Sequence, residues 1–157
     1  MTETTTTRSI EYATFILERV YPTTRERVYA AMANTELKAK WFGAQDGHIS
    51  WDFNFHEGGR EVHSGNMTLP NGEEHHSKFD AYYLEIVENE RITWSYNLCA
   101  DGVKQSSSLT VVELTTAPEG IRLTFTRTGA FFDGHEKPSR REEGSGWILD
   151  AFGETLT

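Results

Sequence analysis

Residues 12–22 read YATFILERVYP, and this stretch sets the beginning of the fold. Its β-branched and aromatic side chains alternate between two faces, as Ile16 and Leu17 do, and this alternation predicts a β-strand from Tyr12 to Tyr21. Pro22 ends the strand, because proline restricts the residue before it and has no N–H to donate to a sheet.

The order of the patterns after this strand predicts the fold class. Two short helical stretches end at Trp41-Phe42, a long run of strands and turns follows, and one amphipathic helix around Gly146-Trp147-Ile148 closes the chain. This order predicts an α+β fold, in which a curved antiparallel sheet wraps around one long C-terminal helix and two short helices follow the first strand. Such a sheet encloses a hollow more readily than a solid core, so we expect a pocket.

Length and composition predict one domain over residues 10–157, preceded by a disordered, threonine-rich tail at 1–9. The formal net charge is −9, and an acidic surface repels phosphate, so we expect no nucleic-acid partner. No apolar run approaches the roughly 20 residues of a membrane-spanning helix, so we expect no membrane contact. Cys99 is the only cysteine and the N-terminus lacks a secretory signal, which together predict a cytoplasmic protein.

Capping residues and turn residues predict the element boundaries. Thr23 or Thr24 is expected to cap the first helix, and Asn34 to end it shortly before a second helix begins. Further strands are expected over Trp51–Phe55, Arg60–Met67, Ser77–Val87, Arg91–Asn97, Ser106–Thr115 and Ile121–Thr126. A change in apolar parity predicts a bulge near Tyr82-Tyr83.

The last part of the chain is expected to form a loop and then the final helix. The loop covers residues 128–138, and the helix begins near Ser139. The helix is expected to bury an apolar stripe of Trp147, Ile148, Ala151, Phe152 and Leu156.

Five motifs, in matching order, resemble those of one known family. They are the opening strand and helix (Arg19-Val20-Tyr21-Pro22 and Glu26-Arg27-Val28-Tyr29-Ala30-Ala31), the second helix (Leu37-Lys38-Ala39-Lys40-Trp41-Phe42), a hairpin (Asp52-Phe53 and Glu57-Gly58-Gly59-Arg60), a turn (Glu85-Ile86-Val87 and Glu90-Arg91-Ile92) and the last helix (Gly146-Trp147). Over residues 10–156 the chain resembles the START-like helix-grip (SRPBCC) superfamily. The matching branch is named for the C-terminal domain of the activator of the ninety-kilodalton heat-shock protein ATPase.

The resemblance implies a helix-grip fold with a cavity between the sheet and the final helix. Members of the superfamily bind lipids, sterols, polyketides and aromatic compounds, and some are cyclases or hydrolases. The eukaryotic activator also carries a separate N-terminal domain for its chaperone partner, and this chain has no room for one. We therefore do not expect a chaperone-activating role.

Aromatic side chains are the main candidates for lining a cavity, because they combine apolar area with polar handles. The expected ligand-binding residues are Trp41, Trp51, Phe53, His63, Phe79, Tyr83, Trp94, Tyr96, Phe125, Trp147 and Phe152, and Phe55 belongs to the same aromatic set. His63 shares a strand face with Glu61 and is the polar candidate. The alternative is that the aromatic residues fill an ordinary core and that His63 lies at the surface.

The sequence contains no motif for metal, phosphate, dinucleotide or local nucleophilic chemistry, so we expect no metal and no cofactor. His75-His76 are neighbours on a strand and point to opposite faces, so they cannot readily chelate one metal. Strand parity makes Asp52 and Glu113 the acids expected to be partly buried, with Asp52 expected to pair with Arg60.

Three functions follow from these expectations. The leading hypothesis is binding of a small hydrophobic or aromatic molecule without catalysis. The second is an enzyme of the cyclase, hydrolase or dehydratase type, with His63, Asp52 or a tyrosine as the acid–base group. The third is a stress-related module that contacts a chaperone. An open sheet edge also allows a homodimer, and the sequence leaves the oligomeric state undecided.

Overall fold

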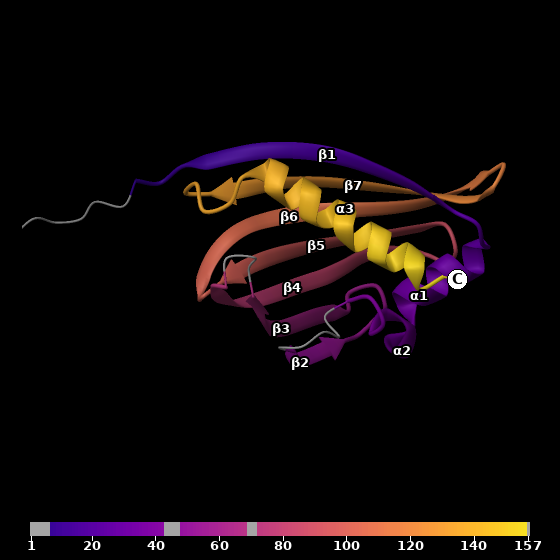
Figure 1. Cartoon of the computed structure of the whole chain (residues 1–157), viewed down its shortest axis with the longest axis horizontal. Helices are drawn as coiled ribbons and strands as arrows, with labels where there is room; N and C mark the ends of the chain where they lie inside the picture. Colours follow the sequence, from indigo (N-terminus) through magenta and orange to yellow (C-terminus); the bar gives the residue numbers. More distant parts are fainter. Residues whose placement is uncertain (1–6, 43–47, 69–71, 157) are drawn as a thin grey trace, which may run out of the picture.

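The computed structural model describes residues 7–42, 48–68 and 72–156. Within these residues, one antiparallel sheet has the strand order β1-β7-β6-β5-β4-β3-β2. The strands are β1 Ile10–Tyr21, β2 His48–Phe53, β3 Arg60–Thr68, β4 Glu74–Val87, β5 Arg91–Ala100, β6 Val103–Ala117 and β7 Gly120–Phe132. The sheet curves around the C-terminal helix α3, Pro138–Glu154 (Figure 1). This arrangement confirms the predicted α+β helix-grip fold.

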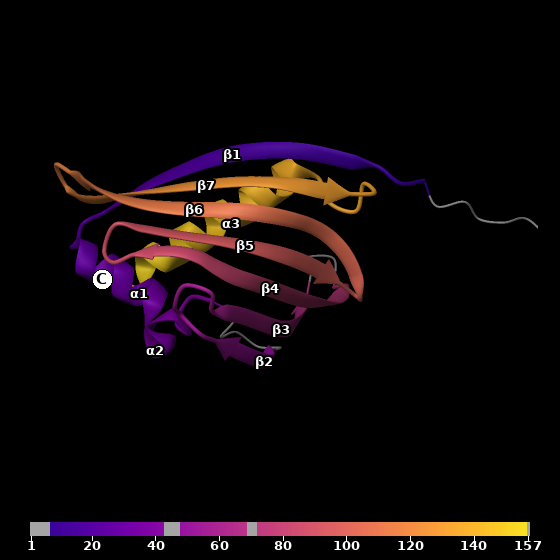
Figure 2. The same ribbon diagram turned by 180° about the vertical axis from the view of Figure 1, so that it is seen from behind.

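The first strand of the sequence lies at one edge of the sheet, beside the last strand. β1 pairs with β7 along its whole length, from Ile10 opposite Phe132 to Tyr21 opposite Ile121. The other strands from β2 to β7 pair with their sequence neighbours, as the view from behind shows (Figure 2). The sheet is therefore a meander with β1 added at its edge.

Two short helices connect β1 to the rest of the sheet, as predicted. Helix α1 spans Arg25–Ala33, and the hydroxyl of Thr24 caps it by accepting from the Arg27 N–H at 3.3 Å. Asn34 ends α1 and also caps α2, Thr35–Lys38, through a 3.0 Å bond from the Leu37 N–H. The two helices therefore share one residue at their junction, which sets the direction of α2 toward the sheet.

The bulge prediction is confirmed, and the loop prediction is partly wrong. The register of β4 against β5 shifts between Tyr83 and Glu85, where the apolar parity changes. Residues 128–132, expected in a loop, continue β7, because β1 pairs with all of them and β6 pairs with residues 128–131. The turn comes later, at Asp133 and Gly134, which have φ angles of 56° and 66°.

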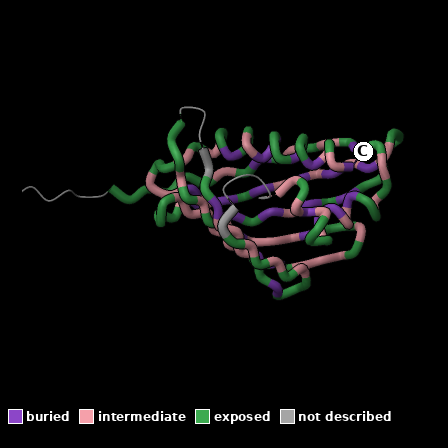
Figure 3. The backbone as a smooth tube through the Cα atoms, turned by 60° about the horizontal axis from the view of Figure 1, so that its bottom comes forward, coloured by how far each residue is buried: buried purple, intermediate pink, exposed green. Residues whose placement is uncertain are grey.

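The buried face of the C-terminal helix agrees only in part with the predicted one, since Phe152 and Leu156 are buried as expected. Its buried residues are Arg141, Ser145, Gly146, Leu149, Phe152 and, just beyond its end, Leu156. Trp147, Ile148 and Ala151 were expected in the buried stripe and are exposed. The true stripe includes two polar residues, which hydropathy alone would place outside. Figure 3 shows how buried and exposed residues alternate along the chain.

The expected tail at 1–9 lies largely outside the described residues, which begin at residue 7. Arg8 forms an ion pair with Asp133 at 2.9 Å, and the Ser9 N–H donates to the same carboxylate. Among the described residues, no helix is long and apolar enough to cross a membrane.

Candidate functional site

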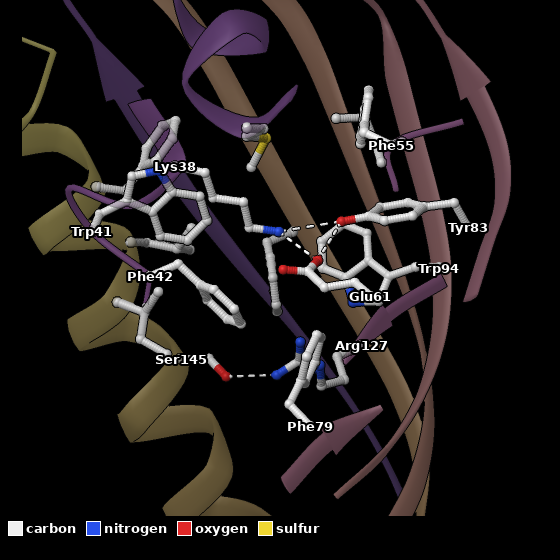
Figure 4. A pocket seen from close by; sticks show the side chains of 16 residues that line it. Lys38, Trp41, Phe42, Phe55, Glu61, Phe79, Tyr83, Trp94, Arg127 and Ser145 are labelled. Atoms are coloured by element: carbon white, nitrogen blue, oxygen red, sulfur yellow. Dashed lines mark hydrogen bonds and ion pairs between the residues drawn. The ribbon is translucent and has the colours of Figure 1, made fainter. Parts of the chain in front are cut away.

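A cavity of about 80 Å³ lies between the inner face of the sheet and α3 (Figure 4). The sheet, α3 and the α1–α2 segment all contribute to its wall, where the α1–α2 segment means residues 25–42, the two short helices and the turn after them. The lining residues are Met32, Lys38, Trp41, Phe42, Phe55, Glu61, Phe79, Tyr83, Ile92, Trp94, Phe125, Arg127, Ser145, Ile148, Leu149 and Phe152.

Most of the wall is aromatic, and neighbouring rings hold each other in place. The ring of Trp41 meets that of Phe152 edge to face at 5.0 Å between centroids, which connects the α1–α2 segment to α3. The Trp41 indole N–H also donates to the carbonyl of Ala31 at 2.8 Å. On the sheet side, the ring centroids of Trp94 and Phe125 lie 6.4 Å apart, edge to face. The wall is therefore apolar and supported from several elements.

The structure brings six of the expected ligand-binding residues together around the cavity. They are Trp41, Phe79, Tyr83, Trp94, Phe125 and Phe152, and Phe55 from the same aromatic set joins them. Three others lie one layer farther out and support the wall. Trp51 donates its indole N–H to Glu61, Phe53 packs against Lys38, and Tyr96 packs against Arg127.

The remaining two expected residues do not line the cavity. His63 is half-buried on β3, and its ring contacts that of Phe42 at 5.5 Å. Trp147 is 66% exposed. The helical position of Trp147 explains its exposure, because burial of Leu149 and Phe152 turns residue 147 away from the sheet.

The expected partly buried acids are also placed differently. Asp52 and Glu113 are both exposed. Arg60 does not form its close ion pair with Asp52, and its guanidinium instead donates two hydrogen bonds to Asp80, at 2.9 and 2.8 Å. Asp80 lies on β4 directly beside β3, where its side chain matches the reach of Arg60, and the pKa of Asp80 falls below its usual value because of this bond.

The buried acid of the cavity is Glu61, whose side chain is fully buried. Its Oε1 accepts from the Lys38 ammonium at 2.6 Å and from the Tyr83 hydroxyl at 2.6 Å. Its Oε2 accepts from the Trp51 indole N–H at 2.8 Å. Both carboxylate oxygens therefore have donors, and Lys38 supplies the countercharge.

Lys38 approaches Glu61 from the end of α2, across the cavity. Its ammonium also lies 4.4 Å from the ring centroid of Phe53 and 4.6 Å from that of Phe42, in cation–π contact. Burial lowers the pKa of Lys38, and the nearby Glu61 carboxylate opposes that shift. Burial raises the pKa of the Tyr83 hydroxyl, which stays protonated and serves as a donor to Glu61.

The sequence does not predict a site role for Lys38 or Arg127, and for Glu61 it predicts only a strand face shared with His63. Charged residues are almost always exposed unless they are paired, and no local pattern announces a partner on another strand. One signal was present, because inward parity of His63 on β3 implies inward parity of Glu61 and Gly65, and both of these are buried.

Arg127 is the second buried cation of the wall, with a residue exposure of 8%. Its Nε donates to the Thr110 hydroxyl at 2.9 Å, and its Nη1 donates to the Ser145 hydroxyl at 3.0 Å. The guanidinium lies 4.5 Å from the ring centroid of Tyr96 and 4.6 Å from that of Phe125. Sheet and helix therefore hold the group in one orientation.

A polar layer continues from Arg127 toward the N-terminal end of α3. Arg141 donates to the Tyr96 hydroxyl at 2.7 Å and forms an ion pair with Glu136. The hydroxyls of Ser106 and Ser108 on β6 and the indole N–H of Trp94 are buried without a hydrogen-bond partner among the described residues. Buried polar groups therefore extend from the cavity wall into this part of the interior.

The described residues contain no group of three or more histidine, cysteine or acidic side chains arranged to hold a metal. His75 instead contacts Asp101 at 2.7 Å, and this hydrogen bond raises the pKa of the His75 ring. The surface histidine pair at the start of β4 is therefore part of a local charge cluster near the β5–β6 turn.

Comparisons with known proteins agree with this architecture. The crystal structure of protein Mll3558 from Rhizobium loti is 37% identical, with a TM-score of 0.83 over 94% of this chain and 99% of that one. An uncharacterized protein from Rhizobium leguminosarum is 30% identical, with a TM-score of 0.85 over 96% and 98% of the two chains. An AHSA1-like protein from Aeromonas hydrophila shares the fold at 20% identity, with a TM-score of 0.63 and 92% of both chains covered.

No curated protein matches the chain at a significant level. The family model described as "Activator of Hsp90 ATPase homolog 1-like protein" matches residues 22–157. This match covers the two short helices, most of the sheet and α3. The chain belongs to the family of activator of Hsp90 ATPase homolog 1-like proteins.

Proposed function

We propose that this protein binds a small hydrophobic or aromatic molecule in the cavity between the sheet and α3. The observation that carries the proposal is the cavity itself, with aromatic side chains around it from the sheet, from α3 and from the α1–α2 segment. The family's fold is in general a ligand-binding fold, which supports the same function. Shape and apolar lining are the usual properties of a small-molecule site.

The size of the cavity restricts the ligand. Its volume of about 80 Å³ is several times the roughly 10–15 Å³ that one water molecule needs, and well below the roughly 300–1,000 Å³ of a drug-sized pocket. The ligand is therefore compact, on the order of a single substituted ring. Burial of roughly 150 Å² of such a ring stabilises the complex by about 4 kcal/mol before association costs, so ring burial alone gives affinity no tighter than about millimolar.

The test is saturable binding of a one-ring probe, toluene, measured by saturation-transfer difference NMR. We expect wild-type protein to bind toluene and the variant Phe79→Trp to bind it more weakly, because the larger ring fills part of the cavity. Trp147→Phe is the matched control, since Trp147 is an exposed aromatic residue of α3. Binding that Phe79→Trp leaves unchanged, or that Trp147→Phe removes, would contradict the proposed location.

An enzyme that uses the same cavity is the second candidate. It is favoured by the polar part of the wall, where Glu61, Lys38 and Tyr83 form a connected network. Of the acid–base groups expected from the sequence, Tyr83 lines the cavity, whereas Asp52 is exposed. Hydrolysis of an activated aryl ester that Glu61→Gln abolishes without unfolding the protein would favour catalysis over binding alone.

A further inference from the structure

The charges of the cavity wall do not balance. The wall contains Lys38, Arg127 and Glu61 as its charged residues. Glu61 neutralises Lys38 through a 2.6 Å ion pair. Within the described part of the chain, no carboxylate lies within 4.0 Å of the Arg127 guanidinium. The wall therefore has one excess positive charge, in a chain whose formal net charge is −9.

The other buried arginine emphasises this imbalance. Arg141 has its own carboxylate partner, Glu136, in addition to the Tyr96 hydroxyl. Arg127 packs its guanidinium against the ring of Tyr96. Its polar partners are the hydroxyls of Thr110 and Ser145. Hydroxyls orient a guanidinium but do not neutralise it, so the fold supplies position without a countercharge.

The guanidinium keeps hydrogen-bonding capacity after these contacts. Nε and Nη1 are used, while Nη2 has no hydrogen-bond partner among residues 7–42, 48–68 and 72–156. Figure 4 shows Arg127 held by Ser145 beside Phe79, at the edge of the aromatic part of the wall. Burial lowers the pKa of Arg127 to about 10, so the group stays positively charged at neutral pH.

We propose that the natural ligand is a compact aromatic carboxylate, whose carboxylate pairs with Arg127 and whose ring packs against Phe79, Trp94 and Phe125. This proposal rests on the proposed function and names the class of molecule that the cavity accepts. A planar carboxylate matches the planar donor fork of a guanidinium. The ion pair would also add to the binding free energy, because burial of one ring in a cavity of this size gives only weak affinity.

The experiment compares sodium benzoate, benzamide and toluene as probes of the full-length chain at pH 7, by saturation-transfer difference NMR titration. Benzamide has nearly the same shape as benzoate without the charge, and toluene has the ring alone. We expect benzoate to bind about tenfold or more tightly than benzamide, which is the range of a charge-assisted hydrogen bond. Equal affinity for benzoate and benzamide would overturn the carboxylate assignment.

Two substitutions locate the effect. Arg127→Met should remove the preference for benzoate while toluene still binds. Arg122→Met is the matched control, because Arg122 lies on the same strand with opposite parity and the change in net charge is identical. A benzoate preference that survives Arg127→Met, or disappears in Arg122→Met, would overturn the proposal. If Arg127→Met does not fold, Arg127→Lys replaces it, and we expect a reduced preference because ammonium binds carboxylate as a point charge; an unchanged or increased preference would overturn the role of the fork.

The probes also separate this proposal from the function on which it rests. If benzamide and toluene bind as well as benzoate does, the cavity is a ligand site without carboxylate recognition. If none of the three binds, the proposed function fails for one-ring ligands, and the carboxylate proposal fails with it.

Discussion

The ion pair between Lys38 and Glu61 lies in the interior, and the pair between Arg60 and Asp80 lies at the surface. Lys38 and Glu61 are both almost fully buried, whereas the side chains of Arg60 and Asp80 are 49% and 21% exposed. Both pairs have short contacts, at 2.6 and 2.8 Å. Their environments differ, and burial decides what happens when one partner is removed, because the remaining charge must stay in a medium that solvates it poorly.

We predict that Glu61→Gln destabilises the protein by about 3–5 kcal/mol, since it leaves the Lys38 ammonium buried without a countercharge. The double variant Lys38→Met/Glu61→Gln should recover a large part of that loss. Urea unfolding of the four proteins of this double-mutant cycle measures the coupling between the two residues.

The surface pair Arg60–Asp80 provides the control cycle, with Arg60→Met and Asp80→Asn. Its coupling should lie at about 1 kcal/mol or less, because water screens both side chains. A coupling for Lys38–Glu61 as small as that of the surface pair would mean that water or another group solvates the buried charges.

At the level of single residues, the sequence predicted the aromatic members of the site better than its charged members. Trp94 and Phe125 were found through strand alternation, which is a local property. Lys38 lies on a four-residue helix, and its burial depends on the carboxylate of Glu61, 23 positions later on β3. Long-range pairing of this kind leaves no periodic signal in one sequence.

At the scale of the element, α3 depends on its glycines in different ways. A Cβ at Gly144 would have no atom within 4 Å, so this glycine lowers helix stability without a packing reason. A Cβ at Gly153 would lie 2.7 Å from the Tyr21 ring, which is buried and holds the Leu149 carbonyl through its hydroxyl at 2.8 Å. Gly153 therefore allows the helix to approach β1 closely.

We predict opposite effects for alanine at these two positions. Gly144→Ala should raise the free energy of unfolding by about 0.5–1 kcal/mol, through helix propensity and a less flexible unfolded chain. Gly153→Ala should lower it by about 1–3 kcal/mol, because the buried tyrosine ring must move. Thermal unfolding followed by circular dichroism compares both variants with wild type. Similar changes of the same sign would show that the close approach at Tyr21 is not what requires glycine.

The elements differ in how much of them the sequence predicts. Strand alternation located β3 to β6 to within a few residues, and the capping residues Thr24 and Asn34 located the two short helices. The buried face of α3 was predicted correctly only at Phe152 and Leu156, because Arg141 and Ser145 replace apolar residues at two inward positions. Their hydrogen bonds to Tyr96 and Arg127 make burial favourable, and hydropathy contains no information about such partners.

At the scale of the whole molecule, the sheet pairs its first strand in sequence, β1, with its last, β7. The hydroxyls of Thr14 on β1 and Thr128 on β7 lie 3.0 Å apart, although 114 positions separate them in sequence. By contrast, β4 and β5 form a hairpin with a short turn at residues 88–90. Because loop-closure entropy opposes distant pairing, we infer that the hairpins form before β1 docks onto β7.

We predict that substitutions in these two regions change different rate constants. Phe15 on β1 stacks with Phe125 of β7 at 6.4 Å and is buried, so Phe15→Leu should mainly raise the unfolding rate. Ile92 on β5 is buried within the meander, so Ile92→Val should mainly lower the folding rate. Stopped-flow tryptophan fluorescence across urea concentrations separates the two rates. Late docking of β1 requires a φ-value near 0 for Phe15→Leu and a clearly larger one for Ile92→Val. A φ-value for Phe15→Leu that equals or exceeds that of Ile92→Val would instead place β1 in the folding nucleus. In that case β1 would pair with β7 no later than the β4–β5 hairpin forms.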